Sequence, residues 1–368
     1  MLKALAAAGL VILFSSAAAF CQEDAPRPEI PDAAEIRQVA AKAVDGFIRP
    51  GYRNFLAAAG TLTEEMDRLC SAPSPEALAR AKNALTAAGN RWGRIEIVRT
   101  GPAIEDNRFE RILFYPDRKS IGLKQVQALL ARPDESVTAP GGLSGKSVAL
   151  QGFGALEFVL AGTGSEVLAQ DAQSFRCRYG KAVAGNLEDI AAELTALWDA
   201  PNGIQQSWKE PGPDNPLFRN EQEAMTALLG ILVHAAEMVR DQRIETFYRS
   251  GDKRSFPKQA IFWRSGNTWT MIEANLEGLQ DLVGSSGMVA LLPDDQRSII
   301  SSVQFVLKSM LRITRDMNPD VEAAVSDEAQ RQKLDFLLVN GRDLISRLND
   351  QYGGAIGLTS GFSFSDGD

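Results

Sequence analysis

The sequence predicts an all-α protein made of two helical-bundle domains that pack against each other with a cleft at their interface. Apolar residues recur at helical spacing over long segments. Helix-start signals precede several of them, at Pro75-Glu76, Pro293-Asp294-Asp295 and Ser326-Asp327-Glu328. Two short apolar stretches, 95–98 and 111–115, are compatible with strands, but they are too few to build a sheet. The clearest apolar stripes lie within residues 78–88, 187–197, 225–239, 299–311 and 334–348.

Proline and glycine divide the chain. With 368 residues the chain is long enough for two ordinary domains. Residues 201–216 contain four prolines and two glycines, a density that does not allow a helix to continue. We therefore expect an N-terminal bundle over 30–200, a linker over 201–216, and a C-terminal bundle over 217–352. Residues 353–368 are rich in glycine with alternating apolar residues, and they predict an extended tail on the body.

The first residues have the pattern of a secretory signal. Lys3 precedes an apolar run and three alanines follow at 17–19, which predicts a signal peptide over 1–19, or 1–20, and a periplasmic protein. The alternative is a lipoprotein anchored through Cys21, although Phe20 is bulky for the residue before such a cysteine. No later stretch has membrane length, so we expect no transmembrane helix in the mature chain. The formal net charge of −8 argues against a nucleic-acid groove, which needs a basic surface.

Two cysteines remain in the predicted mature body, Cys70 and Cys177. In an oxidising compartment they are natural disulfide partners, and the alternative is a pair of buried thiols. The chain-entropy model gives a loop of this length about 4–5 kcal/mol of stabilisation.

One short segment carries the most functional information. Residues 152–157 read Gly-Phe-Gly-Ala-Leu-Glu, and Phe-Val-Leu-Ala-Gly follows. This resembles the G-x-H-x-x-E helix of the imelysin-like family (imelysin, or M75 peptidase-like periplasmic proteins), with Gly154 at the position of the histidine. Trp92, the Gly101-Pro102 pair, residues 111–117 (Arg-Ile-Leu-Phe-Tyr-Pro-Asp) and the tail ending in Asp-Gly-Asp also resemble that family. The resemblance extends from about residue 36 to residue 368, and many relatives carry cysteines at positions similar to the two body cysteines.

The resemblance implies two bundles of about four helices each, with the motif near their interface, and a role in iron-regulated or haem-related uptake. A histidine and a glutamate three residues apart share one helix face, where they can bind a metal or relay a proton. Here only Glu157 carries over, as a ligand or polar anchor; the alternative is a buried glutamate bonded to a neighbouring helix. Two glycines in one helix suggest close packing or room for a ligand. The residues expected to line the cleft are Gly152, Gly154, Glu157, Trp92, Arg99 and Asp117.

The only histidine, His234, lies in a second H-x-x-E pattern with Glu237, outside the family context. We expect it to be a packing or capping residue, since a zinc hydrolase needs three protein ligands and a general base. The aromatic residues Phe262, Trp263 and Trp269 are expected to pack in the core or between the domains.

These observations favour a non-catalytic periplasmic protein that binds a ligand or partner in the cleft. Its partners would be iron or haem uptake components or another envelope protein. No cofactor is required by the sequence, although iron or another divalent metal fits the resemblance. The alternatives are a metal-dependent hydrolase or peptidase that uses Glu157 with carboxylates from elsewhere, and a structural partner of an envelope complex.

Overall fold

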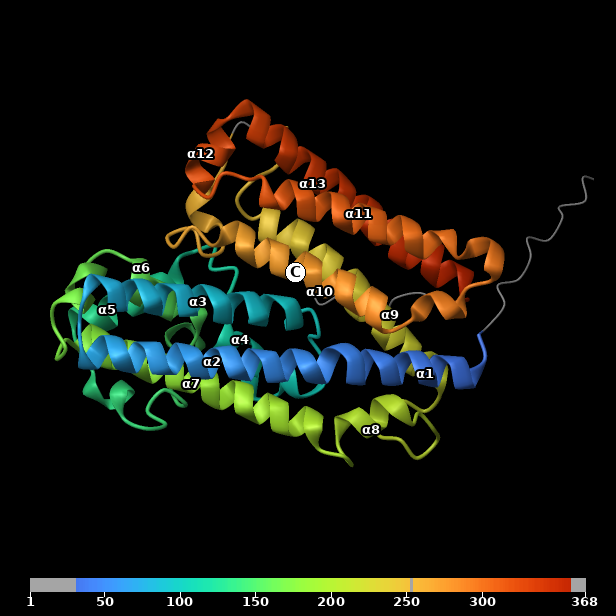
Figure 1. Cartoon of the computed structure of the whole chain (residues 1–368), viewed down its shortest axis with the longest axis horizontal. Helices are drawn as coiled ribbons and strands as arrows, with labels where there is room; N and C mark the ends of the chain where they lie inside the picture. Colours follow the sequence, from blue (N-terminus) through green and yellow to red (C-terminus); the bar gives the residue numbers. More distant parts are fainter. Residues whose placement is uncertain (1–30, 252–253, 359–368) are drawn as a thin grey trace, which may run out of the picture.

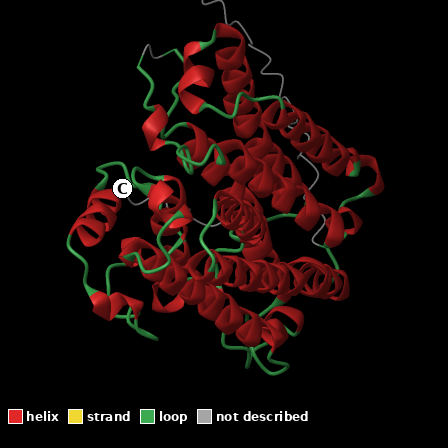
Figure 2. Cartoon of the chain, turned by 60° about the vertical axis from the view of Figure 1, so that its left-hand side comes forward, coloured by secondary structure: helices red, strands yellow, loops and turns green. Residues whose placement is uncertain are grey.

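The computed structural model describes residues 31–251 and 254–358, and in this part every regular element is a helix. Figure 2 shows helices joined by loops and no strand among the described residues. The all-α prediction is confirmed, and the strand alternatives are wrong. Ile95 ends a helix, and residues 97–98 and 112–113 are buried in helix ends and loops. Such short apolar runs do not distinguish a strand from any other buried segment.

Thirteen α-helices are defined among the described residues. They are α1 (Ala33–Ala43), α2 (Arg49–Ser71), α3 (Pro75–Ile95), α4 (Arg108–Ile112), α5 (Ile121–Ala131), α6 (Phe153–Ala161), α7 (Phe175–Asp199), α8 (Ile204–Lys209), α9 (Glu221–Glu237), α10 (Thr268–Ser285), α11 (Ser298–Arg315), α12 (Val321–Ser326) and α13 (Glu328–Ser346). Residues Val44–Ile48, Met238–Ile244 and Arg347–Gly353 are π-helical.

The helix ends follow the local sequence signals. The hydroxyl of Ser74 accepts a hydrogen bond from the Ala77 amide at 3.1 Å, and Pro75 occupies the first turn of α3. Asp327 caps α13 in the same way, through the Gln330 amide at 2.9 Å. These two helix starts were predicted from the sequence.

The first half is organised around α2, α3 and α7, which lie side by side (Figure 1). A disulfide joins Cys70 near the end of α2 to Cys177 near the start of α7, with 5.7 Å between the two Cα atoms. The predicted pairing is confirmed. It closes a loop of 107 residues, so it restricts the unfolded chain over most of the first half.

The second half contains α9, α10, α11 and α13, and α10 packs directly on α3 of the first half. Two glycines allow this approach. A Cβ on Gly278 would lie 2.2 Å from the carbonyl oxygen of Arg94, and one on Gly93 would lie 2.9 Å from the Cβ of Ala274. One buried apolar cluster therefore runs through both halves.

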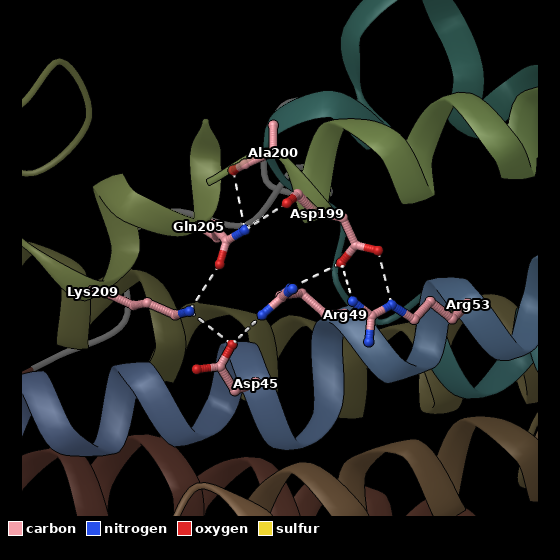
Figure 3. Close-up of polar contacts among 7 residues, drawn as sticks. All are labelled: Asp45, Arg49, Arg53, Asp199, Ala200, Gln205 and Lys209. Carbon is pink, nitrogen blue, oxygen red and sulfur yellow. Dashed lines mark hydrogen bonds and ion pairs between the residues drawn. The ribbon is translucent and has the colours of Figure 1, made fainter. Parts of the chain in front are cut away.

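The segment 201–216, which proline and glycine mark as a linker, contains the short helix α8 and is bonded to its surroundings (Figure 3). The Gln205 amide donates to the carbonyls of Asp199 and Ala200, at 2.9 and 3.1 Å. Lys209 donates to Asp45 at 2.7 Å and to Gln205 at 2.8 Å. Arg49 and Arg53 both bond the carboxylate of Asp199, at 2.8–2.9 Å. The connection between the halves is thus held against the end of α7 and the segment Val44–Ile48, and the end of α7 is held against α2.

Several predictions fall at the chain ends. The signal peptide and Cys21 lie outside the described residues, as does 359–368 of the predicted tail. The part of the tail that is described, 353–358, is a helical turn and not the extended chain that we expected. No helix in the described ranges is both long and apolar enough to cross a membrane.

Candidate functional site

The glycine motif begins α6, and its two glycines have different environments. Gly152 is the N-cap residue, so it precedes the helix that the sequence analysis placed it in. A Cβ at this position would lie 2.2 Å from the carbonyl oxygen of Ile112. Only glycine permits this contact between α6 and the end of α4.

Gly154 is the second residue of α6 and faces open space. No atom outside its own helix lies within 4 Å of the position that a Cβ would take. It is exposed, whereas Ala155 to Leu160 are buried. Three residues later on the same face, Glu157 joins Gly154 in lining a cavity of about 100 Å³. We call this the α6 cavity, defined by Asp117, Gly152, Gly154, Glu157, Lys258, Trp263 and Arg264.

The carboxylate of Glu157 is buried, with 3% of the residue exposed, and it accepts bonds from the second half of the chain. Its Oε1 accepts from the amides of Arg264 and Ser265 and from the Ser265 hydroxyl, each at 3.1 Å. Its Oε2 lies 3.6 Å from the Arg264 guanidinium. Burial raises the pKa of the Glu157 carboxyl above its ordinary value, and the charge of Arg264 and the Ser265 bonds oppose this rise.

The remaining wall of the α6 cavity combines a capping carboxylate with cations and aromatic rings. Asp117 accepts from the amides of Ile121 and Leu123, at 2.7 and 3.0 Å, and so fixes the start of α5. Two cations lie over the Trp263 ring, with the Arg264 guanidinium carbon 4.4 Å and the Lys258 ammonium 5.8 Å from its centroid. The cavity is therefore made by both halves of the chain.

Comparison with known protein families shows to which family this chain belongs. The family model described as Imelysin (Peptidase_M75) matches residues 48–348. The chain belongs to the imelysin family. No curated protein matches the chain.

Two solved structures share the imelysin fold of this chain. One is an imelysin-like protein from Psychrobacter arcticum 273-4, with a TM-score of 0.74 and 19% identity over 91% of this chain and 99% of that one. The other is described as a putative iron-regulated protein A precursor from Parabacteroides distasonis ATCC 8503. It has a TM-score of 0.70 and 16% identity, over 88% of this chain and 98% of that one.

The donor set of the α6 cavity does not fit a metal ion. Glycine at 154 supplies no donor, and Oε1 of Glu157 and both oxygens of Asp117 already accept bonds from neighbouring amides. Oε2 of Glu157 faces the Arg264 guanidinium at 3.6 Å, a cation that disfavours a metal ion beside it. Within the described ranges, no three histidine, cysteine, aspartate or glutamate side chains are grouped so as to hold a metal. A first-row metal at a protein site generally needs more free donors than this imelysin-family chain offers here.

The structure brings together four of the six residues expected at the cleft, namely Gly152, Gly154, Glu157 and Asp117. Trp92 lies elsewhere, fully buried between the rings of Phe55 and Phe109. Arg99 lines a different cavity, which also contains His234 and Glu237. The Nδ1 atom of His234 lies 3.1 Å from Oε2 of Glu237, so this pair is bonded internally.

Sequence reasoning missed the residues that hold Glu157. Arg264 and Ser265, which bond Glu157, and Lys258, which lines the same cavity, are about one hundred residues away along the chain. No spacing rule connects them to α6. The available signal was the aromatic pair Phe262-Trp263, which was expected to pack in the core or between the domains. Both residues do line the α6 cavity.

Proposed function

We propose that this imelysin-family protein acts outside the cytoplasm as a binding protein and not as a peptidase. Its α6 cavity binds one chemical group of a ligand or of a partner protein. The biological setting is iron or haem uptake. The iron-regulated name of one structural neighbour supports that setting.

One observation supports this proposal above the others. The motif retains the carboxylate of Glu157, but this carboxylate binds the backbone of residues 264–265. Oε1 of Glu157 is saturated by three donors from residues 264–265, while the position expected to carry the histidine is an empty space beside Gly154. A general base must reach the proton of an attacking water, and a metal ligand needs a free lone pair. Glu157 instead fixes the loop that precedes α10, which shapes the cavity for binding.

The test compares turnover with binding. Purified protein is assayed for hydrolysis of fluorescent casein with and without chelator, and separately titrated with Fe(II), Fe(III) and haem by fluorescence quenching. We expect no turnover, no saturable binding of free Fe(II) or Fe(III) at the α6 cavity, whose donor set does not fit a metal ion, and saturable binding of haem that Gly154→Leu weakens at least tenfold by filling the cavity.

Gly154→Ala serves as the matched control, because a single methyl group meets nothing within 4 Å. Hydrolysis that chelation and Glu157→Gln both abolish would establish the hydrolase alternative. Haem binding that Gly154→Leu leaves unchanged would place the site outside the α6 cavity.

A further inference from the structure

A second cavity, of about 670 Å³, lies along α9 where this helix meets the end of α3. We call it the α9 cavity and define it by Ile97, Thr226, Ala227, Gly230, Ile231 and His234. It shares no lining residue with the α6 cavity. Its volume is within the range of sites that enclose small organic ligands, about 300–1,000 Å³.

Thr226, Gly230 and His234 follow one another at four-residue spacing on α9, so they share one face of this helix. Gly230 makes an indentation between the two larger side chains. Among the described residues, a Cβ on Gly230 would meet only the ring of His234 within 4 Å, with Nε2 at 3.7 Å and Cδ2 at 3.9 Å. Close packing therefore does not require glycine here, and the space over Gly230 is part of the cavity.

His234 presents a hydrogen-bond acceptor beside this indentation. Its Nδ1 lies 3.1 Å from Oε2 of Glu237, and a carboxylate accepts, so Nδ1 carries the proton. In the neutral ring Nε2 is then an acceptor. Within 31–251 and 254–358 no hydrogen bond reaches Nε2 of His234 or the hydroxyl of Thr226. One face of α9 thus carries two polar groups that have no protein partner.

The charged side chains that line the α9 cavity already have partners. Three of them form ion pairs, which are Glu96 with Arg243, Asp241 with Arg240, and Arg99 with Glu110. The carboxylate of Glu237 is bonded to His234. Glu223 accepts from the Arg219 amide at 2.7 Å and lies about two helical turns before Gly230. No unpaired charge therefore lies beside Nε2 of His234.

This arrangement selects the chemical class of a ligand. A charged group here would lose its hydration without gaining a partner of opposite charge, and a carboxylate has no proton to give to Nε2. A neutral hydroxyl group loses less on leaving water, and it can donate to Nε2 and accept from the Thr226 hydroxyl. Ile97, Ala227 and Ile231 provide an apolar wall in the same cavity.

We propose that the α9 cavity binds a neutral amphipathic molecule, a hydroxyl group on an apolar body. The hydroxyl lies over Gly230 and donates to Nε2 of His234, and the apolar body packs against Ile97, Ala227 and Ile231. This site goes beyond the proposed function, because it takes a different chemical class at a different cavity.

Calorimetric titration of the full chain at pH 8 with 1-octanol tests the proposal. The matched probe is its isomer heptyl methyl ether, which has the same size but no proton to donate. We expect one saturable site for octanol and binding about three- to tenfold weaker for the ether, as the loss of one neutral hydrogen bond implies. The charged probes n-octylammonium and octanoate should both bind more weakly than octanol.

Two variants separate the hydrogen bond from the shape of the cavity. His234→Phe keeps a ring but removes the acceptor, so octanol should then bind no more tightly than the ether. Gly230→Leu fills the indentation and should weaken both probes at least tenfold. Gly154→Leu is the control, because it fills the α6 cavity and should leave octanol binding unchanged. Circular dichroism verifies that each variant is folded.

Nitrogen-15 NMR gives a direct measurement without any variant, because the chain contains one histidine. We expect the Nδ1-protonated ring in the free protein, and octanol but not the ether should shift the Nε2 signal. A ring protonated at Nε2, ether binding as tightly as octanol, or octylammonium binding more tightly would each overturn the proposal. So would the absence of a saturable octanol site. Loss of octanol binding in Gly154→Leu with retention in Gly230→Leu would overturn it too, by placing the alcohol in the α6 cavity.

Discussion

The carboxylate of Glu157 occupies a motif position associated with metal binding or proton transfer, but in this protein it holds a loop of the second half. Its three donors come from a loop 107–108 residues later in the chain, and the amides of Arg264 and Ser265 would lose this acceptor without it. A buried donor left without a partner costs about 1–3 kcal/mol. Retention of this glutamate beside Gly154 therefore has a structural reason that does not involve catalysis.

Titration of Glu157 gives a prediction with a definite sign. Its pKa is raised in the folded protein, so the folded state binds the proton more tightly than the unfolded state. Its stabilising contribution is complete below the unfolded value of about 4.3 and is lost as pH rises through the folded pKa. Glu157→Gln keeps an acceptor oxygen but does not titrate.

We therefore expect the free energy of unfolding of Glu157→Gln, relative to wild type, to increase from pH 4 to pH 7. The increase is about 1.4 kcal/mol for each pH unit between the folded and unfolded pKa values. Urea unfolding at a series of pH values measures it, with the exposed Glu166→Gln as control. A relative stability that is constant or decreases with pH would contradict this account.

The two glycines at the start of α6 differ in the space around them, so alanine should have opposite effects on stability at the two positions. Gly154→Ala adds a methyl group in open space on a helix, so it should stabilise the protein by about 0.4–1 kcal/mol by restricting the unfolded chain. Gly152→Ala places its Cβ 2.2 Å from the Ile112 carbonyl and should destabilise it by about 1–3 kcal/mol. Urea midpoints of the two variants measure this contrast. Equal effects would mean that close packing at Gly152 is not needed.

A helix could be predicted from the sequence where the residues that stabilise it lie close to it along the chain. Periodicity and helix-start signals identified long helices such as α3 and α13, because their apolar stripes are local and Pro75 or Asp327 lies at the helix start. The helix in 201–216 was missed, since Lys209 near its end is held by Asp45, which lies 164 residues earlier in the chain. For the same reason the spacing of Gly154 and Glu157 predicted their common cavity, whereas nothing local distinguished Trp92, a core residue, from a cleft residue.

A buried charge cluster joins the two halves at the scale of the whole molecule. Arg243 donates to Oε1 of Glu96 at 2.6 Å, and both side chains are almost fully buried. Asn275 on α10 donates to the same oxygen and to the carbonyl of Gly93 on α3, each at 2.7 Å. Together with the apolar cluster shared by both halves, these contacts make separate unfolding of the halves unfavourable.

Arg243→Met tests this coupling, because it leaves the carboxylate of Glu96 buried without its cation. Breaking a buried pair in this way costs about 3–5 kcal/mol, whereas removing both charges costs less. In scanning calorimetry we expect wild type to unfold in one transition and Arg243→Met to shift that whole transition to lower temperature. The double variant Glu96→Gln/Arg243→Met should recover part of the loss. If the halves are instead independent, two transitions will appear and the substitution will move only one of them. The Glu96–Arg243 pair would then stabilise one half and not the interface.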